Sequence, residues 1–129
     1  MGLPQDEETT VLKVNIMEFK SDKAIYEQIA EYVCEKVLRG EWKAEERMPS
    51  VREFAVSLTV NPNTVMRAYE HLERNGIIYS KRGIGFLIGA DSRQKAAELM
   101  REDFLKSVPA FVSRMKLLGI DFKELELYA

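Results

Sequence analysis

The 129-residue sequence is poor in the residues on which many enzymes and metalloproteins depend. Its single cysteine excludes an intramolecular disulfide and a zinc site built from cysteines, and Cys34 is best interpreted as a small buried hydrophobic residue. Its single histidine, His71, has no partners at the spacing of a catalytic or metal site, so we expect it at or near the surface. We therefore predict no metal centre.

Long hydrophobic runs are also missing. The apolar stretches are far shorter than the roughly 20 residues that a membrane-spanning helix needs, and no signal-peptide pattern is present. We therefore expect a cytoplasmic protein that does not enter a membrane. No phosphate-binding loop or nucleophile elbow occurs, and Gly83-Ile84-Gly85 is too short for a dinucleotide-binding loop. The sequence accordingly predicts a protein that is not an enzyme and has no cofactor.

The sequence also lacks the strongly basic balance of many nucleic-acid-binding chains, because its net charge is −2. The distribution of charge is more informative than the total. Residues 43–86 contain seven Lys or Arg and five Glu, so this segment carries +2 and the remainder carries −4. The asymmetry is modest, but it favours the central segment as the face toward an anion.

The central segment contains a short helix with a strong start signal at residues 61–72. Asn61 can cap the first free backbone N–H groups, and Pro62 suits the first helical position. An apolar stripe at helical spacing is formed by Val65, Ala68, Tyr69 and Leu72. The opposite face carries Asn63, Arg67, Glu70 and Arg74, with Thr64 and His71 at its edge. Because it is apolar on one side and equipped for base contacts on the other, we interpret this segment as a DNA recognition helix.

A second short helix precedes the recognition helix. Ser50 and Glu53 form an S-x-x-E capping box, and an apolar stripe starts at Val51 and covers about ten residues. The short link Thr59-Val60 gives the two helices the form of a helix-turn-helix. A longer helix is expected upstream, at about residues 23–39.

A basic hairpin is predicted directly after the recognition helix. Two β-prone runs, at residues 77–80 and 86–88, flank the five residues Lys81-Arg82-Gly83-Ile84-Gly85. A basic hairpin in this position is typical of a winged helix. Its two cations are placed to meet a phosphate backbone.

Beyond residue 91 the sequence becomes helical again. One helix is expected to run to about Ser107, Pro109 to break or restart it, and Asp121 to cap a last turn. The apolar stripes of these short helices contain Leu99, Met100, Phe104, Phe111, Val112, Met115 and Leu118. Such stripes more often pack against a partner subunit than stay exposed. We therefore predict an N-terminal tail or lead-in at 1–18, a winged helix-turn-helix DNA-binding domain at 19–90 and a helical dimerisation region at 91–129.

Together these motifs resemble the winged-helix domain of GntR-family transcriptional regulators over about residues 19–118. The resemblance is carried by Met48-Pro49-Ser50-Val51-Arg52-Glu53-Phe54, Val60-Asn61-Pro62-Asn63-Thr64-Val65, Arg67-Ala68-Tyr69, Leu72-Glu73, Gly76, Arg82-Gly83-x-Gly85 and the opening Ile25-Tyr26-Glu27-Gln28-Ile29-Ala30. The N-P-N-T-V-x-R-A-Y form and the short helical tail are similar to the YtrA subfamily in particular. The resemblance implies a mainly α-helical fold with a small β-hairpin, and a homodimeric bacterial DNA-binding repressor without a large effector domain. Such regulators often control transporter genes.

Carried over residue by residue, the resemblance implies DNA contacts at Ser50, Arg52, Asn61, Asn63, Thr64, Arg67, Gly83 and Gly85, to which the basic hairpin adds Lys81 and Arg82. Arg67 is the best candidate for a base contact, because its planar fork can grip guanine; a phosphate contact or a solvated position is the alternative. Asn63 and Thr64 could instead serve only the start of the helix. Arg52 could instead form a surface ion pair with a neighbour such as Glu45 or Glu46.

Several partners are compatible with this sequence. We expect double-stranded DNA and a second copy of the chain, which would place two recognition helices in successive major grooves of a pseudo-palindromic operator. An unidentified small apolar effector between the tail helices is a further candidate, although no polar groups converge there. The competing hypothesis is a winged helix used for protein–protein contact without a specific DNA site, since the net charge is negative and later turns of the recognition helix carry glutamates.

Overall fold

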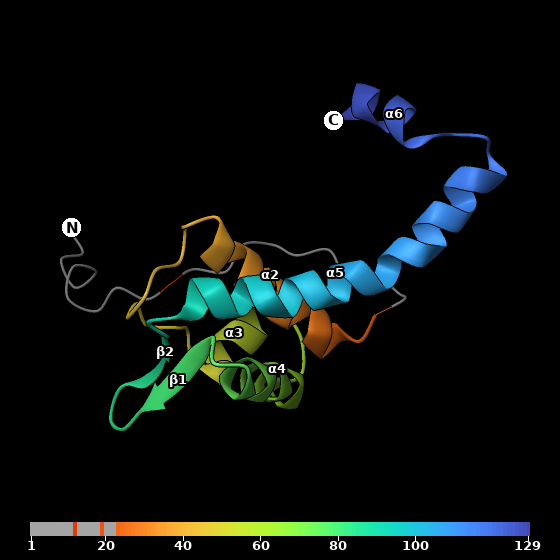
Figure 1. Cartoon of the computed structure of the whole chain (residues 1–129). Helices are drawn as coiled ribbons and strands as arrows, with labels where there is room; N and C mark the ends of the chain where they lie inside the picture. The colour runs from red at the N-terminus through yellow and green to blue at the C-terminus, as the bar shows by residue number, and fades with distance from the viewer. Residues whose placement is uncertain (1–11, 13–18, 20–22) are drawn as a thin grey trace, which may run out of the picture. The chain divides into compact units, whose positions relative to one another are not determined.

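The computed structural model describes Leu12, Phe19 and residues 23–129 (Figure 1). Its elements in chain order are α2 (Ile25–Leu38), α3 (Val51–Leu58), α4 (Pro62–Arg74), β1 (Ile78–Lys81), β2 (Gly85–Ile88), α5 (Ser92–Leu117), α6 (Phe122–Leu125) and the 3-10 helix η1 (Glu126–Tyr128). The prediction of a mainly α-helical fold with one small β-hairpin is confirmed. The chain divides into two compact units, Met1–Glu98 and Leu99–Ala129. Except for Leu12, the predicted lead-in before residue 19 lies outside the described residues.

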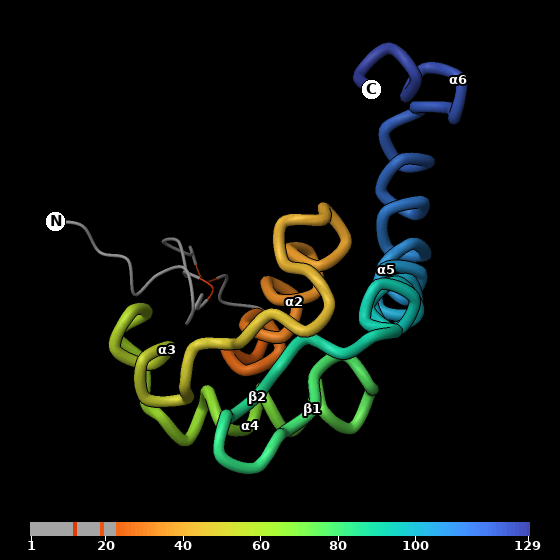
Figure 2. Tube along the Cα trace, turned by 90° about the vertical axis from the view of Figure 1, so that its left-hand side faces the viewer, coloured from red at the N-terminus to blue at the C-terminus, as the bar shows by residue number. Residues whose placement is uncertain are grey.

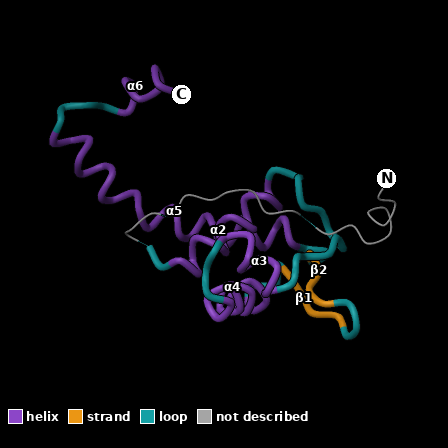
Figure 3. Tube along the Cα trace, turned by 180° about the vertical axis from the view of Figure 1, so that it is seen from behind, coloured by secondary structure: helices purple, strands orange, loops and turns teal. Residues whose placement is uncertain are grey.

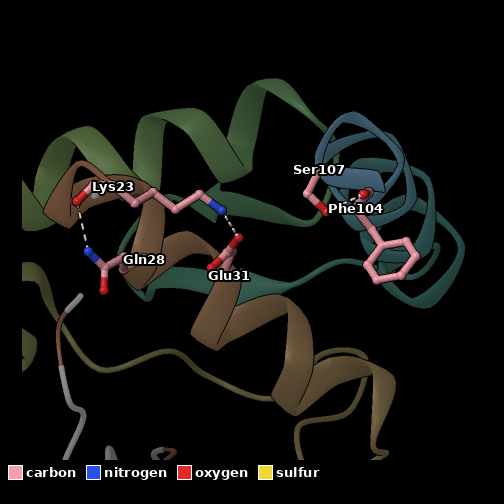
Figure 4. Close-up of polar contacts among 5 residues, drawn as sticks. All are labelled: Lys23, Gln28, Glu31, Phe104 and Ser107. Carbon is pink, nitrogen blue, oxygen red and sulfur yellow. Dashed lines mark hydrogen bonds and ion pairs between the residues drawn. The ribbon is translucent and has the colours of Figure 1, made fainter. Parts of the chain in front are cut away.

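The body of the first unit consists of α2, α3 and α4, with α4 packed against both of the others (Figure 2). Helix α2 begins at Ile25, two residues later than predicted, and Ala24 at its N-cap provides no side-chain cap. The Gln28 side chain instead donates to the Lys23 carbonyl (2.8 Å), and Lys23 also forms an ion pair with Glu31 (Figure 4). The inner face of α2 is buried and includes Ile29, Val33, Cys34 and Val37, as apolar residues at helical spacing predict, whereas Ile25, expected in the same stripe, is 41% exposed.

Local capping signals fix the starts of α3 and α4. The Ser50 hydroxyl accepts from the Glu53 amide (3.0 Å) and the Glu53 carboxylate accepts from the Ser50 amide (2.9 Å), so the predicted capping box is confirmed. The Asn61 carboxamide oxygen accepts from the Asn63 amide (2.7 Å), with Pro62 as first helical residue. Thr59 turns the chain between the helices in the left-handed conformation, with φ 55° and ψ 50°. This conformation was not predicted, because a β-branched residue rarely adopts it.

Tyr69 lies at the centre of the core. Its ring is fully buried and meets the rings of Phe54 and Phe86 edge to face, with centroid distances of 5.8 and 5.1 Å. Its hydroxyl donates to the Pro49 carbonyl (2.6 Å), directly before the cap of α3. One side chain of α4 therefore contacts α3, the segment before α3 and the hairpin.

The hairpin projects from the three-helix body, as Figures 1 and 3 show from opposite sides. Its strands pair antiparallel, with Ile78 opposite Ile88 and Lys81 opposite Gly85. Residues 45–48 extend this pairing on the other side of β2: the Met48 amide donates to the Phe86 carbonyl (2.8 Å) and the Ile88 amide to the Glu46 carbonyl (2.9 Å). The segment leading into α3 therefore holds the base of the hairpin, a pairing that was not predicted from the sequence.

In the second unit, the predicted break at Pro109 is wrong. Helix α5 continues through this proline from Ser92 to Leu117. Proline removes one backbone donor, and the Ser107 hydroxyl donates to the Phe104 carbonyl (2.6 Å) in the turn before it (Figure 4). The good helix formers on both sides, such as Leu, Met, Lys and Ala, favour continuation. The predicted last turn is confirmed, since the Asp121 carboxylate accepts from the Glu124 amide (2.8 Å) at the start of α6.

Within the part of the chain that the structure describes, no helix combines the length and apolar character required to cross a membrane.

Candidate nucleic-acid interface

The two faces of α4 differ as its sequence predicts. The inner residues Val65, Ala68, Tyr69 and Leu72 are all 0% exposed. On the outer face Asn63, Arg67 and Glu70 are exposed, and Thr64 and His71 at the edge are half-buried. This helix is therefore firmly held from one side while its polar side chains remain available for contacts with a ligand.

At the start of α4, two predicted contact residues also serve the backbone. The Asn61 side-chain oxygen accepts from the Asn63 amide, and this bond does not use the side-chain NH₂ group of Asn61. The Thr64 amide donates to the Asn61 carbonyl (2.9 Å) within the first turn. The helix-start role considered for Asn63 is therefore fulfilled by its backbone, and the Asn63 side chain remains exposed.

Arg67 lies against an aromatic ring of another helix. Its guanidinium carbon is 4.1 Å from the centroid of the Tyr26 ring, in the first turn of α2. The His71 ring meets the same tyrosine nearly perpendicularly, at 87° with centroids 6.0 Å apart. A groove lies beside this contact and is lined by Ala24, Ile25, Tyr26, Asn63, Thr64 and Arg67. Tyr26 was not predicted as part of this site, because it lies 41 positions before Arg67 in the chain.

At the start of α3, Ser50 and Arg52 are exposed. The Ser50 hydroxyl is engaged in the capping box, whereas Arg52 forms no ion pair among the described residues. The glutamates considered as its partners are used elsewhere: Glu45 accepts a hydrogen bond from the Tyr79 hydroxyl, and Glu46 accepts one from the Lys43 amide (2.7 Å). Among the described residues Arg52 is therefore not paired with a carboxylate, and it lies at a helix start, where the free backbone N–H groups also favour an anion.

The hairpin presents its two cations at the tip. Lys81, Arg82, Gly83 and Gly85 are all exposed, and the Ile84 amide donates to the Lys81 carbonyl (2.9 Å) to close the turn. Both glycines have the left-handed φ values that the turn requires, 83° and 115°. The Ser80 hydroxyl donates to the Glu73 carboxylate of α4 (3.2 Å), so a side-chain hydrogen bond also joins this strand to the recognition helix.

The second unit exposes large apolar side chains. Among the predicted dimerisation residues, Phe104 is 68%, Phe111 56% and Leu118 68% exposed, and Leu99, Met100 and Val112 are half-buried. Met115 differs, because it is already buried within the single chain. Further exposed apolar residues of this unit are Leu105, Leu117, Phe122, Leu127 and Tyr128.

The residues that the structure describes contain no group of three or more potential metal ligands. The candidate interface instead consists of the exposed polar face of α4, the basic tip of the hairpin and Arg52 at the start of α3.

Comparisons with known proteins agree with this arrangement. Residues 25–88 match the family of bacterial regulatory proteins named gntR, a range that covers α2 to β2. The chain is 38% identical over 108 residues to the HTH-type transcriptional regulator YhcF of Bacillus subtilis, covering 84% of this chain and 88% of that protein. It is 43% identical over 79 residues to the HTH-type transcriptional repressor YtrA of the same organism, covering 61% of each.

A solved structure shows the same fold. The GntR family transcriptional regulator from Listeria monocytogenes superposes with a TM-score of 0.69 at 34% identity, covering 85% of this chain and 96% of that one. The family consists of transcriptional regulators rather than enzymes. The chain, which is similar to YtrA among these regulators, therefore belongs to the gntR family and is a DNA-binding transcriptional regulator with a winged helix-turn-helix fold.

Proposed function

We propose that this protein is a sequence-specific transcriptional repressor that binds a pseudo-palindromic operator as a homodimer. The observation that carries the proposal is the face of α4, where exposed Asn63 and Arg67 lie outside four fully buried residues. A helix held in this way can enter a major groove without losing its orientation. Transporter genes are the target class that the family resemblance implies.

Each candidate residue has a role defined by its chemistry. Arg67 reads a base edge, preferably guanine O6 and N7, while Asn63 reads adenine or binds phosphate. Thr64, the Asn61 amide group, Ser50 and Arg52 bind the backbone near the two helix starts. The hairpin tip contacts the phosphates of the neighbouring DNA backbone through Lys81, Arg82, Gly83 and Gly85.

The homodimer is supported by the exposed apolar side chains of the second unit. Three phenylalanines, Phe104, Phe111 and Phe122, are each more than half exposed, which is costly for a chain that works alone. We place the dimer interface on this unit, with Leu99, Met100, Val112 and Leu118 around the aromatic residues and Met115 supporting them from within the chain. The repressor role is supported by the relative YtrA, which is named a transcriptional repressor.

The decisive experiment is a binding titration with labelled duplex DNA from upstream of the protein's own gene. A shuffled duplex of equal composition is titrated beside it, at two salt concentrations. We expect tighter binding to the natural duplex that persists at the higher salt, because base contacts add to the salt-sensitive phosphate contacts. Equal binding to both duplexes that disappears at high salt would contradict sequence-specific recognition of this region.

The dimer is tested separately by sedimentation equilibrium. Phe111→Asp places a charge in the proposed interface and is expected to shift the protein toward monomer and to weaken operator binding. Ser113→Asp introduces the same charge at an exposed polar position of the same helix and serves as the matched control. A Phe111→Asp protein that sediments like the wild type would contradict the proposed interface.

A further inference from the structure

The contact between Arg67 and Tyr26 connects the recognition helix to a residue outside the helix-turn-helix. We propose that Tyr26 is a positioning residue: its ring holds the Arg67 guanidinium in the orientation that reads DNA, and it thereby sets specificity at the base pair that Arg67 contacts. This inference rests on the proposed function of Arg67 as a base-reading residue. It goes beyond that function by assigning to Tyr26 of α2 a role in how well Arg67 discriminates between base pairs.

The geometry is that of a cation–π contact. The guanidinium carbon lies 4.1 Å from the ring centroid, well inside the roughly 6 Å within which the ring attracts a cation. The Tyr26 ring is itself half-buried, and its nearly perpendicular contact with His71, one turn along α4 from Arg67, limits its movement. The ring is therefore a fixed platform beside an otherwise exposed arginine.

The contact leaves the hydrogen-bonding groups of Arg67 available. A ring attracts a guanidinium through its flat face, whereas the five N–H donors point outward in its plane. The contact with the Tyr26 ring and bidentate bonding to guanine therefore use different parts of the same group. Base pairs and phosphates can be approached from the groove that Asn63, Thr64 and Arg67 line together with Tyr26.

A neutral partner also has an advantage over a carboxylate. No ion pair of Arg67 occurs among the residues that the structure describes, so its positive charge is oriented without being neutralised. A free arginine side chain loses considerable rotamer freedom when it binds. Because Tyr26 restricts these rotamers before DNA arrives, less freedom is lost on binding, and misplaced contacts with other bases become less favourable.

Two substitutions separate the ring from its hydroxyl. Tyr26→Phe keeps the aromatic face, and the Tyr26 hydroxyl has no hydrogen-bond partner among the described residues, so this variant is expected to discriminate between bases like the wild type. Tyr26→Leu keeps an apolar side chain of comparable reach but removes the aromatic face. We expect it to lose about two- to fivefold of the discrimination at the Arg67 base pair, with an unchanged salt slope.

The assay is fluorescence anisotropy with the operator and with operators substituted at single base pairs, combined in a double-mutant cycle with Arg67→Ala. In the Arg67→Ala background, Tyr26→Leu is expected to have no further effect on discrimination. Thermal unfolding confirms that each variant is folded. A loss that is as large in the Arg67→Ala background, or equal in Tyr26→Phe and Tyr26→Leu, would overturn the inference.

A measurement without DNA tests the positioning itself. The Arg67 side-chain Nε–H resonance is expected to show a ring-current shift in the wild type and in Tyr26→Phe, and to lose it in Tyr26→Leu. Absence of this shift in the wild type would overturn the contact. A wild type that bound every duplex alike would overturn the proposed function and with it the specificity role of Tyr26, whereas specific binding unchanged by Tyr26→Leu would overturn this inference alone.

Discussion

The buried hydroxyl of Tyr69 supports a quantitative prediction about the core beneath the recognition helix. Tyr69→Phe removes only the oxygen atom that donates to the Pro49 carbonyl at 2.6 Å, while the ring contacts with Phe54 and Phe86 remain. Both the tyrosine and Pro49 are buried, and no other donor to this carbonyl occurs among the described residues. The variant therefore loses a hydrogen bond and leaves a buried acceptor without a partner.

The expected cost is about 2 kcal/mol of the free energy of unfolding, since a lost hydrogen bond of this kind costs roughly 1 kcal/mol and an orphaned buried acceptor roughly 1–3 kcal/mol. The corresponding fall in Tm is about 8–16 °C for a unit of this size. The assay is urea unfolding followed by circular dichroism, at one protein concentration for all variants, because oligomerisation would otherwise change the apparent stability. The slope against urea should stay constant.

Tyr79→Phe is the matched control. It removes a hydroxyl of the hairpin strand β1 that donates to the exposed carboxylate of Glu45, where water can replace the lost partner. We expect a change below about 0.5 kcal/mol. Equal losses in the two variants, or no loss in Tyr69→Phe, would refute the conclusion that burial makes the Tyr69 bond costly to remove.

The difference in stability between the wild type and Tyr69→Phe is also expected to depend on pH. Burial, with a smaller contribution from the Glu53 carboxylate, raises the pKa of the Tyr69 hydroxyl far above its ordinary value. The folded protein therefore keeps this proton when the unfolded chain releases it near pH 10. The stability that this group contributes is fully present below about pH 10 and is lost as the pH rises further, by up to about 1.4 kcal/mol per pH unit. The difference between the wild type and Tyr69→Phe should consequently narrow by about 1 kcal/mol as the pH rises from 9 toward 11.

Three further predictions concern the turn, the strand end and the hairpin tip. Thr59→Gly should raise the free energy of unfolding by about 0.5–1 kcal/mol in urea, because glycine adopts the left-handed conformation of residue 59 without the strain of a β-branched side chain; a loss would contradict this. Gly89→Ala should lower it by about 1–3 kcal/mol, because the new methyl group would lie 3.3 Å from two backbone oxygens, those of Gly76 and Ile77; unchanged stability would show that the backbone yields there. Lys81→Ala should weaken binding to all DNA sequences alike and lower the salt slope by about one, whereas an unchanged slope would exclude a phosphate contact.

The features that could be predicted from the sequence are those set within one helical turn. The Ser50–Glu53 capping box and the Asn61 cap each join residues no more than three apart, and the apolar stripe of α4 follows from helical spacing alone. The Pro109 prediction failed for a related reason. It rested on one local rule, whereas the continuity of α5 also depends on the helix formers on both sides of the proline.

The features that could not be predicted join residues that are distant in the chain. The pairing of residues 45–48 with β2 spans about 40 positions, and the Arg67–Tyr26 contact spans 41. No periodicity encodes such a contact, because it depends on how α2 packs against α4. The pairing of residues 45–48 with β2 was also difficult to predict, since the stretch is short and charged and has no aromatic or β-branched residue typical of a strand.

Most of the acidic side chains near the interface stabilise the fold and do not form ion pairs with its cations. Of the five glutamates in residues 43–86, four accept hydrogen bonds within the chain, namely Glu45, Glu46, Glu53 and Glu73. None of these bonds neutralises an arginine or lysine. Within residues 43–86, all of which the structure describes, no lysine or arginine forms an ion pair. The carboxylates thus hold the caps and the hairpin in place, and the cations that they might have neutralised remain free to meet phosphate.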